Sequence, residues 1–423
     1  MRSMKRRSLW IINQHAGGPG RHENMARELC ARGWRVRVFA ASFIHNVFME
    51  QKEYPPGCFF LVEEEREVHR VWIKTPVYRG NGLARLLNHL AFARRVSKAG
   101  SWLEPPCAVI GSSPHLLAAL AAFSLAKRHR VPFIFEVRDI WPQSLVDIGA
   151  LGRFSPLAMG MGALEKFLYR QAYGIISVLP EGREYMASLG LDGKRVVHIP
   201  NGVDLAWYDR RLRERSLPRD LQNLLQRLQG RVVFIYAGAH GYANGLETVV
   251  RAAGLLQQKE VQSAHVLMVG DGPSKAGLVK TAREQGLSNI TFLDAQDKEL
   301  VPALLHHVDV CLFHLRKSGA YKYGLSSNKL FEYMAAARPM IAAVDMAPVP
   351  PFSRFGLQVP SDDPEALAGA MAHMAGMLPN ERLKMGRLAR EYVQRFHHVP
   401  VLADGLEEVL LDVLKPYAGS ARP

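Results

Sequence analysis

The sequence predicts an α/β protein with two doubly wound domains, each built on a parallel sheet. The first observation is a buried strand, a glycine-rich turn and a helix over residues 8–31, with a second strand at residues 35–41. The second observation is that the same succession recurs over residues 232–257. The third is the length of 423 residues, which is typical of two or three domains.

The composition limits the class of protein and its partners. The net charge of +15 favours nucleic acid, an anionic lipid surface or phosphorylated small molecules, unless it serves only solubility. The four cysteines are scattered without a CxxC pair, so we expect free thiols in a reducing compartment and no metal site. The apolar runs at residues 9–12 and 116–126 are too short for a signal peptide and a bilayer span, respectively. We therefore expect a soluble or membrane-surface cytoplasmic protein.

The first half of the chain alternates strands with helices. Gly17, Gly18 and Gly20 lie in the turn after the first strand, where glycines let the backbone approach a ligand. Their spacing fits neither GxGxxG nor a P-loop, so the turn alone does not indicate a dinucleotide site. Further strands are expected at residues 58–62, 68–74, 107–110, 132–137, 174–178 and 195–199.

Residues 82–102 predict a basic amphipathic helix. It has an apolar stripe and four cationic side chains, and it contains no acid. Such a helix can lie on an anionic membrane surface, or it can pack against the domain and expose a basic outer face. The stripe consists of Leu83, Leu86, Leu87, Leu90 and Ala91, and the cations are Arg85, Arg94, Arg95 and Lys98.

Charged side chains cluster at the end of the strand expected at residues 132–137. They are Glu136, Arg138 and Asp139. Ligands of open α/β sheets bind at the carboxyl ends of strands, and charged groups are costly to bury, so these three residues are candidates for a binding site. The alternative is an internal arginine–carboxylate pair.

A second candidate site lies in residues 326–343, which predict a helix that leads into a buried strand. Asn328, Lys329 and Glu332 can share one rim of this helix. Backbone N–H groups at the helix start suit a phosphate, and a carboxylate one turn further along suits sugar hydroxyls. The alternative is an ordinary capped helix with a Lys–Glu surface pair.

Several motifs together resemble one family, the retaining nucleotide-sugar glycosyltransferases of family 4, which have the GT-B fold. The forms EVRDIWP at residues 136–142 and GxxGxAxGLE at residues 238–247 are most similar to the branch that adds N-acetylated or deoxy sugars in surface-polysaccharide and O-antigen assembly. The motifs that follow the family order are PNGVD at 200–204, YAG at 236–238, GLE at 245–247, VGDGP at 269–273 and SNKLFEYMAAARPMI at 327–341.

The resemblance implies the GT-B architecture, in which two Rossmann-like domains face each other across a cleft and a C-terminal helix crosses back to the first domain. We accordingly expect an N-terminal acceptor-side domain at residues 1–208, a linker at 209–230, a nucleotide-sugar domain at 231–396, and a C-terminal helix and tail at 397–423. The end of the tail, residues 418–423, is expected to be disordered.

The resemblance also implies roles for individual residues. Glu332 would hold the donor ribose, and Ser326, Ser327 and Asn328 would meet the pyrophosphate beside Lys329. Arg138 and Asp139 stand where many members have a His-Asp pair that touches the donor sugar, so they and Lys329 are the expected catalytic residues. Further donor-binding residues would be Gly17, Gly18, Gly20 and Glu136 in the first domain and Gly238, His240, Gly241, Phe292 and Leu293 in the second.

Three positions depart from the family pattern. Gly324 stands where the family often has an acid, Asn244 stands where it often has a lysine, and Arg138 replaces the histidine of the His-Asp pair. These departures leave the fold expectation intact and bear on the identity of the donor. Asp139 and His115 are the candidates for the general base.

The activity implied by the resemblance is transfer of a sugar from a nucleotide diphosphate sugar, expected to be UDP-linked, with retention and without metal or cofactor. The acceptor would be a polyprenyl-diphosphate-linked sugar or a glycan at the inner face of the cell membrane, where the enzyme would bind peripherally. No nucleic-acid partner is expected, because aromatic residues do not alternate with basic residues on strands. The alternatives are a nucleotide-sugar 2-epimerase of the same fold and a non-catalytic polyanion-binding protein.

Overall fold

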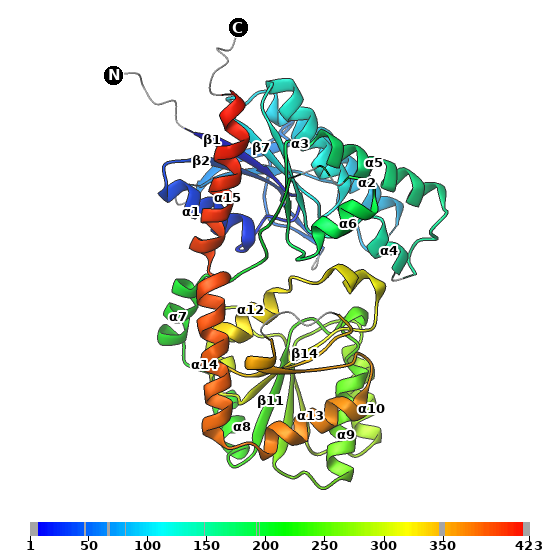
Figure 1. The fold of residues 1–423 in the computed structure, drawn as a ribbon, viewed down its shortest axis with the longest axis vertical. Coiled ribbons are helices and arrows are strands. Elements are labelled where there is room, and N and C mark those ends of the chain that lie inside the picture. Colours follow the sequence, from blue (N-terminus) through cyan, green and yellow to red (C-terminus); the bar gives the residue numbers. More distant parts are fainter. Residues whose placement is uncertain are drawn as a thin grey trace. The chain divides into compact units, whose positions relative to one another are not determined.

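The computed structural model divides the chain into two compact units (Figure 1). Unit 1 comprises Met1–Pro200 and Val399–Pro423, and unit 2 comprises Asn201–His398. The basic start of the chain and the tail 418–423 lie outside the described residues. The structure describes residues 7–45, 48–65, 68–80, 82–147, 149–191, 193, 195–346 and 352–417.

Unit 1 is built on an eight-stranded sheet in which all neighbours are parallel except β5 and β6. Two short strands, β3 (Phe43–Ile44) and β4 (Met49–Glu50), form a separate antiparallel sheet. The strands in spatial order are β10 (Val196–His198), β9 (Gly174–Ser177), β8 (Phe133–Val137), β7 (Ala108–Ser112), β1 (Ser8–Ile12), β2 (Arg35–Ala41), β6 (Val68–Ile73) and β5 (Phe60–Glu65).

Alternating side chains of β1 show how the sheet of unit 1 is covered. Leu9 and Ile11 belong to a core with α1 (Arg21–Ala31) and the C-terminal helix α15 (Val399–Leu414), which contact each other. Trp10 points to the other face, where its ring meets Phe39. This face carries α2 (Leu83–Gly100), α3 (Leu116–His129) and α5 (Pro156–Gln171), with α3 in contact with both others (Figure 1). The C-terminal helix thus returns to the first half of the chain, as expected.

The remaining elements of unit 1 are short. They are α4 (Gln143–Asp147), α6 (Gly182–Ser188) and the 3-10 turn η4 (Lys415–Tyr417). Within the described residues, no helix of either unit is both long enough and apolar enough to span a membrane.

Unit 2 is built on a six-stranded, fully parallel sheet. Val233 and Ile235 face a core with α12 (Asn328–Ala335) and α14 (Pro379–Phe396), and the alternating Phe234 and Tyr236 face a core with α9 (Glu247–Gln258) and α13 (Pro364–Gly376). The strands in spatial order are β13 (Ile290–Leu293), β12 (Ala264–Val269), β11 (Val232–Ala237), β14 (Val310–His314), β15 (Met340–Ala343) and β16 (Gly356–Val359).

The expected linker, residues 209–230, is part of unit 2. It forms the end of α7 (Leu205–Glu214) and all of α8 (Arg219–Arg227). Leu217, just before α8, and Leu221 in α8 are buried in the unit 2 core. The other elements of unit 2 are α10 (Lys275–Glu284), α11 (Val301–His306), η1 (Tyr242–Asn244), η2 (Gly319–Tyr323) and η3 (Phe352–Arg354).

Among the parallel strands of each sheet, the strand order reverses at one point. In unit 1 this point lies between β7 and β1, and in unit 2 between β11 and β14. Ligands of doubly wound sheets bind at the carboxyl ends of the strands beside such a point. The loops that follow these four strands are therefore where a site is expected in each unit.

Candidate functional site

Helix α12 begins beside the reversal point of unit 2. Ser327 is its N-cap residue, but the Ser327 side chain makes no capping hydrogen bond. Ser326 is engaged elsewhere, because its Oγ accepts a hydrogen bond from the Asn201 backbone N–H at 2.7 Å and its carbonyl accepts one from Asn201 Nδ2 at 2.6 Å. The PNGVD turn therefore fixes the segment that enters α12, and Asn328 lies exposed at the first helical position.

Lys329 joins α12 to the loop after β11. Its Nζ donates to the hydroxyl of Tyr236 at 2.7 Å and to Oδ1 of Asn244 at 3.1 Å, and it lies 4.5 Å from the centre of the Tyr236 ring. An ammonium has three N–H donors, and among the described residues two of them are used, which leaves one for a ligand. Burial lowers the pKa of Lys329 to about 8, while Glu332 acts in the opposite direction.

Gly238 provides the space that Lys329 occupies. Its φ of +152° is unfavourable for other residues, and a Cβ there would lie 2.9 Å from Cε of Lys329. The contact with Asn244 also explains one departure from the family pattern. A lysine at position 244 would place a second ammonium against Lys329, whereas an asparagine supplies an acceptor.

Glu332 lies one turn further along α12. Its side chain is half-buried, and within the described part of the chain no group donates a hydrogen bond to its carboxylate. Burial raises the pKa of Glu332, and the nearby Lys298 and Lys329 lower it. A carboxylate with unused acceptor capacity beside an amine can receive the hydroxyls of a polar ligand.

The two glycine turns of unit 2 pack against each other. A Cβ at Gly270 would lie 1.9 Å from the carbonyl oxygen of Gly238. The backbone N–H of His240 donates to the carbonyl of Asp271 at 2.8 Å, and its own carbonyl accepts from the N–H of Ser274 at 2.9 Å. The side chain of His240 is fully buried under these turns. We conclude that His240 holds the turns together and that its ring is not open to a ligand, whereas Gly241 lies partly open.

Phe292 and Leu293 end β13 and are half-buried. The carbonyl of Leu293 accepts from the N–H of Gly270 at 3.2 Å and from Nζ of Lys275 at 3.1 Å. Lys275 in turn pairs with Asp294 at 2.6 Å.

In unit 1, Glu136 forms a buried ion pair. Its Oε1 accepts from Nε of Arg21 at 2.8 Å, and its Oε2 lies 2.6 Å from Nε2 of His22. Burial alone would raise the pKa of Glu136, but His22 and Arg21 hold it well below its usual value. The guanidinium of Arg21 also donates to the carbonyls of Ile199 and Pro200. The internal ion pair considered above is therefore present, with Arg21 rather than Arg138 as the partner.

Arg138 and Asp139 lie in the loop that directly follows β8, the strand that contains Glu136. The backbone N–H of Arg138 donates to Oγ of Ser113 at 3.0 Å, its side chain is half-buried, and Asp139 is exposed. In the turn after β1, Gly17 packs against Trp72, and Gly18 and Gly20 have open space around their Cα atoms. Arg138, Asp139 and this turn thus lie at the carboxyl ends of strands, as expected for a ligand site.

Comparison with known proteins follows the same division of the chain. Residues 17–202 match the family model described as glycosyl transferase 4-like domain, and residues 231–376 match the model described as glycosyl transferases group 1. The chain is a family 4 glycosyltransferase with the GT-B fold.

One curated relative and two solved structures are similar to this glycosyltransferase over most of its length. The relative is the putative colanic acid biosynthesis glycosyl transferase WcaI of Escherichia coli K12, which is 25% identical over 88% of this chain and 90% of its own. The first structure is sucrose-phosphate synthase from Thermosynechococcus elongatus, with a TM-score of 0.72 and 17% identity over 98% of this chain and all of its own. The second is HepE from Anabaena in complex with UDP, with a TM-score of 0.66 and 14% identity over 96% of this chain and all of its own.

The structure brings the second-domain residues of the expected site together only in part. Lys329 and Asn244 join at the reversal point of unit 2, with Glu332 one turn further along α12, whereas Ser326 and His240 are engaged in holding loops in place. The sequence did not identify Tyr236 as the partner of Lys329, although Tyr236 is the first residue of the YAG motif at 236–238. In the part of the chain that the structure describes, no three His, Cys, Asp or Glu side chains are grouped as they would be around a metal ion.

His115 was considered as a general base, but the structure assigns it another role. Its Nδ1 accepts from the backbone N–H of Ala118 at 3.2 Å, which caps α3, and its Nε2 bonds Oε1 of Gln14 at 2.6 Å. Both ring nitrogens are therefore in use, and burial holds the pKa of His115 well below its usual value. His115 does not have a free nitrogen to accept a proton.

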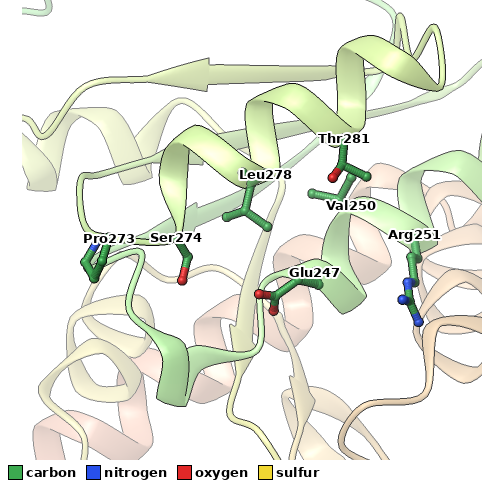
Figure 2. Close-up of a pocket in the computed structure, with 8 residues that line it drawn as sticks. Glu247, Val250, Arg251, Pro273, Ser274, Leu278 and Thr281 are labelled. Atoms are coloured by element: carbon green, nitrogen blue, oxygen red, sulfur yellow. The ribbon is translucent and has the colours of Figure 1, made fainter.

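A cavity of about 310 Å³ lies outside these sites, between α9 and α10 (Figure 2). Figure 2 shows Ser274, Leu278 and Thr281 opposite Glu247 and Val250. Glu247 is already paired with Arg316 at 3.0 Å. None of the expected site residues lines this cavity, so we assign it no part in sugar transfer.

Proposed function

We propose that this glycosyltransferase moves a sugar from a UDP-linked donor to a lipid-linked or glycan acceptor in surface-polysaccharide assembly, with retention and without a metal ion or cofactor. The name of WcaI, a putative colanic acid biosynthesis enzyme, supports the pathway class. The complex of HepE with UDP supports the donor class.

The observation that carries the donor site is the pairing of charges on α12. Glu332 offers a half-buried carboxylate whose acceptor capacity is unused within the described residues, and Lys329 offers one remaining N–H donor one turn before it. A nucleoside diphosphate has the complementary groups, because its ribose carries two hydroxyl donors and its diphosphate is anionic. In this arrangement Glu332 receives the ribose, and Lys329 with the first N–H groups of α12 receives the diphosphate.

The same groups assist bond cleavage. When the bond between the sugar and the diphosphate breaks, negative charge grows on the leaving phosphate oxygen. Lys329 and the α12 N-terminus stabilise that charge without reorganising, because Tyr236 and Asn244 already hold the ammonium in place. The acceptor hydroxyl attacks from the face that the phosphate leaves and passes its proton to the departing phosphate oxygen. Attack from this face retains the anomeric configuration. Arg138 and Asp139 act on the transferred sugar.

We further propose that the enzyme binds an anionic membrane surface through α2. The leucine stripe expected on this helix is exposed, with Leu83 72% and Leu87 52% accessible. The buried side of α2 is instead formed by Asn88, Phe92, Val96 and Ala99. Four leucines, the other two being Leu86 and Leu90, therefore stand in water beside the exposed cations Arg94 and Lys98, which is the pattern of a helix that inserts its apolar face among lipids.

A second group of exposed apolar side chains lies near the start of α5. Phe154 is 83% accessible, and Leu157 and Met159 are also exposed. Helices α2 and α5 both contact α3 on the same face of the sheet (Figure 1). Two separate apolar groups on one face support a peripheral membrane enzyme better than one group would.

The experiment that tests the donor is a thermal-stability screen with UDP-, GDP- and dTDP-sugars, since a ligand of the native state raises the melting temperature. We expect stabilisation by UDP-sugars in the wild type and none in Glu332→Gln at the same ligand concentration. Stabilisation of Glu332→Gln equal to that of the wild type would refute the assignment of the ribose to Glu332.

A further inference from the structure

Four histidines come together at the reversal point of unit 1. His15 follows β1, His45 follows β3, His89 lies on α2, and His115 caps α3 after β7. The rings of His15 and His45 stack with centroids 4.2 Å apart, and those of His89 and His115 stack at 4.0 Å. The two stacks meet at a distance of 6.3 Å between His15 and His115. We call these four residues the histidine cluster.

One member of the histidine cluster is fixed by a chain of hydrogen bonds. Because Nδ1 of His115 accepts from the Ala118 N–H, its Nε2 carries the hydrogen and donates to Oε1 of Gln14. Nε2 of Gln14 donates in turn to Oδ1 of Asn88 at 2.5 Å, and Nδ2 of Asn88 donates to the carbonyl of Pro76 at 2.7 Å. This chain holds α2 and α3 to the loop after β1, and it gives the cluster a rigid base.

Two other members have unused ring nitrogens. Nε2 of His15 and Nε2 of His89 are buried and have no hydrogen-bond partner among the described residues. A buried polar atom left without a partner destabilises the protein, so these two nitrogens point to a ligand.

The charges around the histidine cluster are all of one sign. Arg85 on α2 acts on all four rings, and Arg138 after β8 acts on His15; no carboxylate among the described residues is a main influence on any of the four. Burial, reinforced by these cations, lowers the pKa of His15 to about 3 and that of His89 to about 4. The four rings are therefore neutral at neutral pH beside two guanidinium groups. A multiply charged anion would complete this arrangement.

Helix α2 connects the histidine cluster to the exposed leucines. Arg85 and His89 are four residues apart and share one side of the helix, while Leu86, Leu87 and Leu90 are exposed. A ligand that satisfies both sides of α2 has an anionic head and an apolar chain.

We infer that the histidine cluster and Arg85 bind the diphosphate of a polyprenyl-diphosphate acceptor. The inference rests on the proposed transferase function and assigns the acceptor's charged group to named residues of unit 1. It also predicts proton uptake on binding, because an anion raises the pKa of the neutral imidazoles that it contacts.

The test is calorimetric titration of the full-length protein after saturation with UDP, which occupies the donor site and reports on it separately. The probes are inorganic pyrophosphate and farnesyl diphosphate, a short polyprenyl diphosphate. The variants are Arg85→Gln and His89→Gln, and Arg128→Gln, at an exposed position in the last turn of α3, is the matched control. Thermal unfolding verifies that each variant is folded.

We expect farnesyl diphosphate to bind the UDP-saturated wild type at least tenfold more tightly than pyrophosphate, with net proton uptake at pH 6.5. Binding should weaken at least tenfold in Arg85→Gln and in His89→Gln and stay unchanged in Arg128→Gln. Absence of binding to the UDP-saturated protein, or equal binding in Arg85→Gln and the wild type, would overturn the inference. Equal affinity for the two probes would overturn its lipid part. Failure of UDP itself to bind would instead count against the proposed donor.

Discussion

Replacing Lys329 with methionine separates the contribution of this residue to ligand binding from its contribution to stability. Methionine keeps most of the length of the side chain that packs against Gly238 but removes the ammonium and its bonds to Tyr236 and Asn244. If Lys329 serves the structure alone, the variant should be less stable. If it is held in place for an anion, the variant should bind UDP poorly and remain stable.

The magnitudes follow from the burial of the ammonium. Its pKa falls from 10.5 to about 8, and at 1.36 kcal/mol per pKa unit this means that the charged form costs the free protein roughly 3 kcal/mol at pH 7. In the wild type, the two hydrogen bonds of the ammonium offset this cost by about 1 kcal/mol each, and Lys329→Met loses both the cost and the bonds. The free energy of unfolding should therefore stay the same or rise slightly. A hydrogen bond from a charged donor to phosphate contributes about 1.5–3 kcal/mol, so UDP should bind roughly 10- to 150-fold more weakly.

The assay is UDP titration from pH 7 to pH 9.5 together with urea unfolding. Because the folded-state pKa of Lys329 is lowered to about 8, the wild type should lose UDP affinity as the pH rises above that value, while Lys329→Met should show no such slope. Lys280→Gln, which alters an exposed lysine of α10, is the control and should match the wild type. UDP affinity within twofold of the wild type in Lys329→Met, or a large loss of stability, would refute the reasoning.

Three further predictions concern other parts of the molecule. Glu332→Gln should weaken UDP binding at least tenfold and should abolish the preference for UDP over 2′-deoxy-UDP, which titration with both nucleotides measures; a preference that persists would contradict the ribose contact. Burial raises the pKa of Glu165 to about 8 from 4.5, although Tyr185 and Tyr169 donate hydrogen bonds to it. The neutral form of Glu165 therefore stabilises the fold fully below pH 4.5, and this stabilisation is lost as the pH rises toward 8. Over this window the free energy of unfolding of the wild type should fall by about 1.4 kcal/mol per pH unit relative to that of Glu165→Gln. Parallel pH profiles of the two proteins would contradict this. Changing Leu86 and Leu87 to Glu together should abolish sedimentation with anionic vesicles, whereas Leu383→Glu on α14 should not affect it, and unchanged binding of the double variant would rule out α2 as the membrane contact.

The sequence predicted the fold because local patterns and global architecture agree. Apolar runs such as residues 232–236 become central strands, and each glycine-rich turn follows the strand to which it was assigned. The order of the strands in each sheet determines the reversal points. Local sequence patterns did not predict this order, and the family resemblance supplied it.

Helix α2 shows a limit of periodicity. The spacing of the leucines predicted the helix, but a pattern of apolar residues does not identify the buried face. Asn88 faces the core because Thr75 and Pro76 accept its hydrogen bonds and Gln14 donates one. A polar residue buried in this way turns the leucines outward, and its partners are up to 74 positions away in the sequence.

The charged residues at the end of β8 show a second limit. The position of Glu136 at the carboxyl end of a strand made it a candidate ligand contact, with an internal arginine–carboxylate pair as the alternative. Its partners Arg21 and His22 lie 115 and 114 positions earlier and reach it only in the folded sheet. The histidine cluster was overlooked for the same reason, since its members are spread over four elements. The sequence does contain a signal for two of the four histidines, because His15 and His115 each follow a central strand of the sheet.

The central claim, sugar transfer from a UDP-linked donor, is tested most directly by the fate of the sugar. The purified enzyme is incubated with a radiolabelled UDP-sugar, with and without a polyprenyl-diphosphate-linked acceptor, and the products are separated. The account predicts that label moves to the lipid fraction with retained anomeric configuration, that UDP forms in equal amount, and that neither occurs in Lys329→Met at a comparable rate. Release of UDP and an epimerised free sugar without any acceptor would contradict it.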